Sequence, residues 1–164
     1  MRSFISLFLM SIISISLLTG CGKDEKLTAF EENMTTFYKN IRIIGNEMDA
    51  LDPYDEDAVI QMNYKLESMK QQFEILAAME IPSQFPGIDG LADDALEYME
   101  EAVRLHSLAY EEAEVIDSYI QASSENYESA MKRIEYIATL LQGEIPEGAK
   151  ITEGDGTEFE PYSE

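Results

Sequence analysis

Apolar side chains recur every three or four residues along most of the chain, which is the spacing of one face of an α-helix. The first series lies between residues 27 and 51, and the positions between its members are mostly polar. Its members are Leu27, Phe30, Met34, Phe37, Ile41, Ile44, Met48 and Leu51. A helix that is apolar along one face must bury that face against another element, so the series predicts one helix of a bundle.

A second series with the same spacing follows a short link. The link, residues 51–57 (LDPYDED), combines a helix stop with a helix start, because Asp52 suits a capping position and Pro53 the first helical position. The series consists of Val59, Met62, Leu66, Met69, Phe73 and Leu76. Two helices of similar length with a short link are expected to form an antiparallel hairpin.

A third series follows residues 81–90, whose prolines and glycines predict a loop. Asp89 suits the cap of the next helix. The third series contains Met99, Ala102, His106, Ala109, Ala113, Ile116 and Ile120, and the spacing stays in phase to Leu141. It therefore permits one helix over 90–142, about 80 Å long at 1.5 Å per residue.

The length of the first hairpin argues against so long a helix. Half of it would have no apolar partner, and Ser124 offers a cap at which a fourth helix could begin. The fold class we expect is all-α, an antiparallel up-down bundle of four helices within residues 27–142. The alternative is three helices, with a long and continuous third one.

The N-terminus has the layout of an export signal. Met1 and Arg2 precede an apolar run from Phe4 to Leu18. As a helix this run would reach about 22 Å, short of the roughly 30 Å hydrocarbon core of a bilayer. Residues 1–20 are therefore expected to be a signal peptide.

The end of the run, Leu18-Thr19-Gly20-Cys21, resembles the lipobox of bacterial lipoproteins. The resemblance implies cleavage between Gly20 and Cys21, lipidation of the Cys21 thiol, a short tether over 21–26, and a location on the extracytoplasmic side of the cell membrane. Cys21 is the only cysteine, so no disulfide competes for it. An ordinary signal with an incidental cysteine, or a cytosolic protein with an apolar N-terminus in its core, are the alternatives.

The charge balance limits the choice of partners. The chain has 33 acidic and 11 basic side chains and a net charge of −22. Nucleic acid is excluded because phosphate binding needs a basic surface. The charge favours a basic protein or peptide and a monomeric state, although a merely solvated surface would look the same. Residues 143–164 are acidic, rich in Gly and Pro, and without periodicity, which predicts a disordered tail.

The residues that could carry catalysis or bind metal are few. His106 is the only histidine, and Val103 stands where a Glu-x-x-His metal motif would need Glu. The methionines fall mainly on the apolar series, so core packing accounts for them better than copper binding. Acidic clusters such as 52–57 lack EF-hand spacing but leave calcium open. We expect no enzyme, no metal and no cofactor.

Three residues are candidates for a ligand site. Gly45 interrupts the first helix at a cost of about 1 kcal/mol, which would be offset by close helix approach or a ligand notch. His106 and Tyr110 lie one turn apart on the third helix. Two functions follow: a membrane-anchored binding or scaffolding module with an acidic helical surface, or a small-ligand receptor with a pocket lined by Met and Tyr. An enzyme using His106 or an acid pair is a third hypothesis. The body is similar to small helical lipoproteins without assigned activity.

Overall fold

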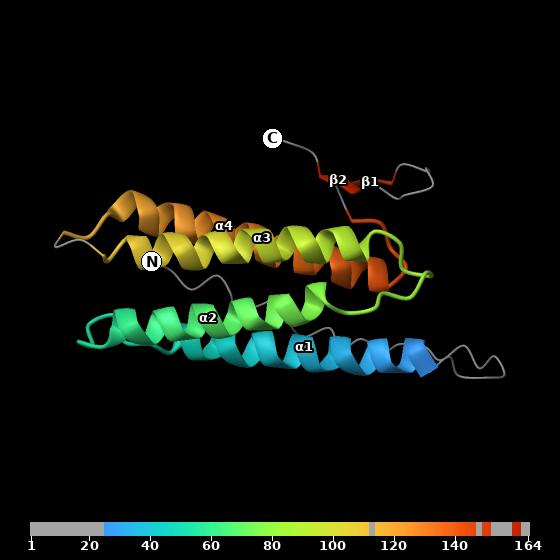
Figure 1. Cartoon of the computed structure of the whole chain (residues 1–164), viewed down its shortest axis with the longest axis horizontal. Coiled ribbons are helices and arrows are strands. Elements are labelled where there is room, and N and C mark those ends of the chain that lie inside the picture. Colours follow the sequence, from blue (N-terminus) through green and yellow to red (C-terminus); the bar gives the residue numbers. More distant parts are fainter. Residues whose placement is uncertain (1–24, 112–113, 147–148, 152–158, 162–164) are drawn as a thin grey trace.

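The computed structural model describes residues 25–111, 114–146, 149–151 and 159–161. Its helices are α1 (Glu25–Asp49), α2 (Ala58–Ala77), α3 (Ile88–Leu108) and α4 (Asp117–Leu141). Successive helices run in opposite directions, and the hairpins α1–α2 and α3–α4 form two layers (Figure 1). The predicted all-α fold with four helices is confirmed.

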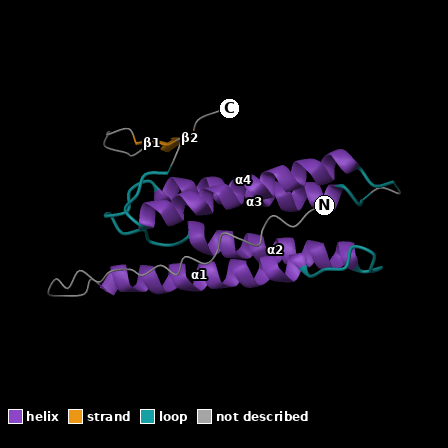
Figure 2. Ribbon diagram, turned by 180° about the vertical axis from the view of Figure 1, so that it is seen from behind, coloured by secondary structure: helices purple, strands orange, loops and turns teal. Residues whose placement is uncertain are grey.

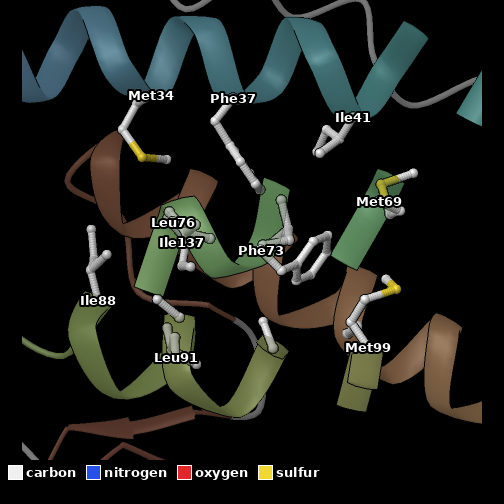
Figure 3. Close-up of a cluster of buried hydrophobic side chains, with 14 of the residues drawn as sticks. Met34, Phe37, Ile41, Met69, Phe73, Leu76, Ile88, Leu91, Met99 and Ile137 are labelled. Carbon is white, nitrogen blue, oxygen red and sulfur yellow. The ribbon is translucent and has the colours of Figure 1, made fainter. Parts of the chain in front are cut away.

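The predicted apolar series form the core. On α1, the side chains of Phe30, Met34, Phe37 and Ile41 are buried. Those of Met34, Phe37 and Ile41 point away from α1 into the bundle, and the ring of Phe73 on α2 meets that of Phe37 edge-on at a centroid distance of 5.8 Å (Figure 3). Each such burial contributes about 1.5–3 kcal/mol, so the series are accounted for by folding.

The third helix holds the two layers together because it faces both α2 and α4. Its most extensive contact is with α4. Small side chains are buried along both helices: Ala92, Ala95 and Ala102 on α3 and Ala130 on α4 are all at most 1% exposed. Small residues let two helices approach closely, since the interaxial distance depends on the side chains at the contact.

The break between the third and fourth helices lies at residues 109–116, so the alternative of one continuous helix is wrong. The break is also not at Ser124, which lies inside α4. Its hydroxyl donates to the carbonyl of Ile120 at 3.1 Å, as serines do within helices. The amide of Ile116 donates to the carbonyl of Ala109 at 3.0 Å and closes the turn.

Two predicted caps also differ from the structure. Pro53 lies in a turn before α2, and the carboxylate of Asp52 accepts from the amide of Tyr54 at 3.0 Å. This is an Asx-turn and not a helix cap. Asp89 lies in the first turn of α3, which is preceded by Gly87 with φ of 82°. That left-handed conformation favours glycine and reverses the chain without a capping side chain.

The C-terminal region contains two short strands, β1 (Ala149–Ile151) and β2 (Phe159–Pro161), paired antiparallel. The expectation of disorder over 143–164 does not hold for these six residues. Figure 2 shows the pair beside the α3–α4 layer. Residues 147–148, 152–158 and 162–164 lie outside the described part of the chain, as do the expected signal peptide and most of the tether. Among the described helices, none is long and apolar enough to cross a membrane.

The two ends of the bundle differ in how they treat apolar side chains. We call the end with the α2–α3 connection, residues 78–87, the closed end. There Phe85 lies against Phe30 with ring centroids 5.5 Å apart, and Met79 and Ile81 also pack against the core. The connection thus closes this end of the core.

We call the other end, which holds the connections 50–57 and 109–116, the open end. Both connections lie at the left in Figure 1. No side chain is buried on α1 beyond Ile41, on α2 before Leu66, or on α4 before Ser123. The core therefore stops well short of the open end along three of the four helices.

Candidate functional site

The outer face of α3 and the neighbouring face of α4 enclose a groove of about 430 Å³. We call it the acidic groove. It is lined by Asp94, Glu97, Tyr98, Glu100, Glu101 and Arg104 of α3 and by Asn126 of α4. The α3 members recur at helical spacing on the side opposite the buried face, so the fold of the helix alone brings them together.

The charges of the acidic groove do not cancel. Arg104 is bound to Glu101, with its Nε donating to Oε2 at 2.7 Å and its Nη2 to Oε1 at 2.5 Å. This hydrogen bonding holds the pKa of the Glu101 carboxyl below its usual value. The other carboxylates of the groove outnumber its single guanidinium. A groove of one sign attracts ions of the opposite sign, so this one favours a cationic group.

One wall of the acidic groove is an aromatic ring that is fixed from α4. The guanidinium carbon of Arg133 lies 4.6 Å from the centroid of the Tyr98 ring, and its Nη2 is 3.4 Å from the Tyr98 hydroxyl. The Nε of Arg133 is buried without a hydrogen-bond partner. Leaving such a donor unpaired costs about 1–3 kcal/mol, and a cation–π contact of about 0.5–2 kcal/mol offsets part of this.

His106 and Tyr110, two of the predicted ligand residues, do lie together. Their ring centroids are 5.2 Å apart. The Nδ1 of His106 is 2.7 Å from the Oδ1 of Asn63 on α2, and Nδ1 is the donor because a carbonyl oxygen only accepts. Burial lowers the pKa of His106, so the neutral imidazole is favoured. The contact links α2 to α3. A ligand role for His106 and Tyr110 stays a prediction.

Gly45, the third predicted ligand residue, does not behave as expected. A Cβ atom built at Gly45 would meet nothing within 4 Å. The predicted close approach of a helix or a ring is therefore wrong, because the space beside Gly45 is open. A ligand role for Gly45 stays a prediction.

The predicted pocket lined by Met and Tyr stays a prediction, and three of the methionines lie in the core. Met34, Met69 and Met99 are at most 4% exposed and belong to the core, and the acidic groove contains one tyrosine and no methionine. Two further tyrosines connect α1 to α4. Burial, and then the charge of Asp49, raise the pKa of Tyr127 to about 12. Burial also raises the pKa of Tyr38.

Gly20 and Cys21, the predicted cleavage and lipidation residues, lie outside the described part of the chain. The chain length still limits where an anchor could be, because Cys21 is four residues from the start of α1. Four residues span at most about 14 Å. The start of α1 lies at the closed end of the bundle.

Neither metal binding nor similarity to other proteins adds to this picture. Within the described residues, no three side chains of His, Cys, Asp or Glu are placed to hold a metal ion. The fold and the groove define an acidic, up-down four-helix protein. Comparisons with protein-family models, with curated proteins and with solved structures find no match to this chain.

The residues of the acidic groove do not stand out in the amino-acid sequence. Asp94, Glu97 and Glu101 have the spacing of one helix face, but this signal is weak in a chain with 33 acidic side chains. What periodicity cannot show is that this face forms a hollow with α4. The groove depends on the placement of α4, and a fourth helix that began at Ser124, as the sequence suggested, would be placed differently.

Proposed function

We propose that this protein is a lipid-anchored, extracytoplasmic binding or scaffolding module that receives basic groups of a partner protein on its acidic helical surface. The observation that carries the proposal is the acidic groove, in which carboxylates outnumber guanidinium groups around a hollow of about 430 Å³. A lysine or arginine side chain has the charge and the reach to enter it. The net charge of −22 would steer such a partner toward the surface and keep nucleic acid and other copies of the chain away.

The anchor part of the proposal depends on the lipobox resemblance at Leu18-Thr19-Gly20-Cys21. A bilayer attached at Cys21 would lie toward the closed end, and α1, with 25 residues, would extend about 37 Å away from it. The acidic groove would then lie on the side of a short upright rod. An acidic body held by lipid, and not by charge, suits a membrane whose surface repels it.

The anchor can be tested by mass spectrometry of the protein recovered from membranes. We expect the first residue to be Cys21 with a mass increase that corresponds to lipid. The variant Cys21→Ala should remain uncleaved and lose the lipid mass. A chain that starts at Met1, or a free thiol at residue 21, would contradict the anchor while leaving the groove untouched.

The groove can be tested with a defined cationic probe, a peptide of alternating lysine and serine. We compare Glu97→Gln/Glu100→Gln in the groove with Glu128→Gln/Glu135→Gln, which removes the same charge from exposed positions of α4 outside it. The groove variant should weaken binding by about three- to tenfold, since each lost contact is worth a few tenths to 1 kcal/mol at an exposed site. Binding should also weaken with salt.

Two results would contradict the groove as the binding surface. One is the absence of peptide binding at low ionic strength. The other is equal weakening by the groove variant and its matched control, which would mean that only the net charge matters.

A further inference from the structure

The open end exposes apolar side chains in a way that the closed end does not. Eight large apolar or tyrosine side chains are exposed among the described residues, and five of them lie at the open end. These five are Tyr54 (93% exposed), Ile60 (55%), Tyr64 (71%), Val115 (54%) and Tyr119 (37%). We call these five residues the open-end cluster.

The members of this cluster belong to both hairpins. Ile60 and Tyr64 are one turn apart on α2, so they share a face. Val115 lies in the connection two residues before α4, and Tyr119 lies in the first turn of α4. Tyr54 extends from the connection 50–57. Single exposed apolar residues are ordinary, but an aliphatic residue followed by a tyrosine at both corners of one end forms a repeated surface.

The segments around the open-end cluster are strongly acidic, and the cations that border them, Lys65 and Arg104, are each paired with a glutamate. The chain has no lysine or arginine between Arg42 and Lys65, nor between Arg104 and Lys132. These two stretches contain both open-end connections. The exposed acidic residues there include Asp52, Asp55, Glu56, Asp57, Glu111, Glu114 and Asp117.

Helix dipoles explain only part of this charge. Acids near the start of α2 and α4 are stabilised by the positive ends of those helices. Asp49 is different, because it lies in the last turn of α1, where a negative charge opposes the dipole. No basic residue lies in the last turn of α1 to compensate. Folding alone therefore does not account for the distribution.

We propose that the open end is the docking surface for a basic partner protein, and that the partner presents a segment in which lysine or arginine alternates with apolar side chains. The apolar groups of the segment would cover the open-end cluster, and its cations would meet the surrounding carboxylates and the faces of the tyrosines. The inference rests on the proposed function, since it adds a second surface for the same cationic partner and names what else that partner must carry.

Charge and position argue against other occupants. An anionic lipid surface would be repelled, and the open end lies about 37 Å along α1 from the end nearest Cys21. A second copy of the chain would bring two sets of carboxylates together, which is unfavourable. A neutral apolar partner would bury those carboxylates without pairing them. A basic and apolar segment avoids all three costs.

The test uses the full chain purified in detergent and two peptides of equal length and charge. One alternates lysine with leucine, and the other alternates lysine with serine. The variant Tyr54→Ser/Ile60→Gln/Tyr64→Gln removes the α1–α2 part of the cluster. The matched control, Ile75→Gln/Ile145→Gln, changes two apolar residues of similar exposure elsewhere.

The unchanged protein should bind the leucine peptide at least about tenfold more tightly than the serine peptide, which corresponds to 1.4 kcal/mol. The open-end variant should lose most of this preference, and the control should keep it. Equal binding of the two peptides by the unchanged protein, or a preference that survives in the open-end variant, would overturn the inference. If the serine peptide does not bind at low ionic strength, the proposed function fails as well.

A second measurement does not depend on any variant. Backbone amide chemical shifts of the unchanged protein, recorded with the leucine peptide, should move in residues 50–64 and 114–120. Shifts confined to the acidic groove on α3 would overturn the inference and support only the charge-based binding proposed above.

Discussion

The closed end and the open end are built from the same four helices, yet they use apolar residues in opposite ways. At the closed end, Phe85 and Ile88 complete the core. At the open end, Tyr54 and Val115 occupy equivalent connecting segments and are mostly exposed. Each end consists of helix termini and connecting segments, so the difference between them lies in the residues that the sequence places there. Folding explains the residues of the closed end, whereas the residues of the open end require another reason.

The charges differ in the same direction. The closed-end connection contains one acidic residue, Glu80, and its carboxylate is paired with Lys26. The open-end connections contain many acids and no base. An exposed ion pair contributes only about 0–1 kcal/mol, so the contrast matters little for stability. It matters for recognition, because the open-end connections present carboxylates with no lysine or arginine among them.

The largest expected effect is in the core, in the half of the bundle nearer the closed end. Phe73 is fully buried, and Phe73→Ala should destabilise the protein by about 3–5 kcal/mol through lost burial and a cavity. Tyr64→Ala at the open end should change stability by no more than about 0.5 kcal/mol. Urea unfolding of both variants measures the difference. Similar losses in the two would contradict the distinction between the ends.

The second effect concerns local opening. Amides of α1 near Phe37 should exchange with deuterium at least about 100-fold more slowly than amides near Glu47, because fewer buried contacts hold the open half of the helix. A factor of 100 corresponds to about 2.7 kcal/mol of local stability. Exchange followed by NMR or mass spectrometry gives both rates. Uniform protection along α1 would show that the open end is as tightly held as the closed one.

The third effect locates the boundary between the ends on α4. Ser123 is buried, and its hydroxyl donates to the carbonyl of Ala102 at 2.7 Å. Ser123→Ala should cost about 0.5–1.5 kcal/mol. The neighbour Ser124 is exposed and bonds only within its own helix, so Ser124→Ala should be nearly neutral. Thermal or urea unfolding of the pair tests this, and an equal effect would move the boundary.

The sequence predicted the helices through their buried faces. Phe30, Met34, Phe37 and Ile41 repeat at helical spacing, and the structure buries all four. This succeeded because burial against a partner imposes a period that can be read along the chain. A helix over 90–142 was expected to be too long for its apolar partners, and the structure does divide this stretch into two helices.

The position of the break could not be read in the same way. The spacing from Ala109 to Ile116 stays in phase with a helix, and the segment contains neither Gly nor Pro. The turn is closed by the backbone bond between these two residues, which leaves no signature in side-chain type. The prediction of a helix cap at Ser124 was wrong because a serine hydroxyl can also donate to a backbone carbonyl inside a helix.

The candidate site was predicted least well, for a different physical reason. Acids on exposed faces have no period that distinguishes a groove from a convex surface, so Glu97 and Glu100 did not stand out. One feature of the sequence does distinguish the open end. The absence of lysine and arginine between Arg42 and Lys65, and between Arg104 and Lys132, marks both corners of the open end.

The smallest expected effect tests whether the open end is held by polar contacts in place of apolar ones. The hydrogen bond between His106 and Asn63 links α2 to α3 there, and burial lowers the pKa of His106 in the folded state. The unfolded chain therefore binds the proton more readily. The stability that this contributes is complete above the unfolded pKa, about 6.5, and is lost as the pH falls through the folded pKa.

His106→Asn separates this contribution from the titration of the many carboxylates. Asparagine keeps an N–H donor near Nδ1 but cannot be protonated. Between about pH 7.5 and about pH 5, the unchanged protein should lose more stability than the variant. The reason is that residue 106 titrates in that range as histidine and does not as asparagine. Urea unfolding at both pH values gives the four free energies. Identical losses would mean that burial at the open end is too slight to affect the imidazole. The hydrogen bond between His106 and Asn63 would then be exposed to solvent, and the solvated part of the bundle would extend further than Leu66 and Ser123 indicate.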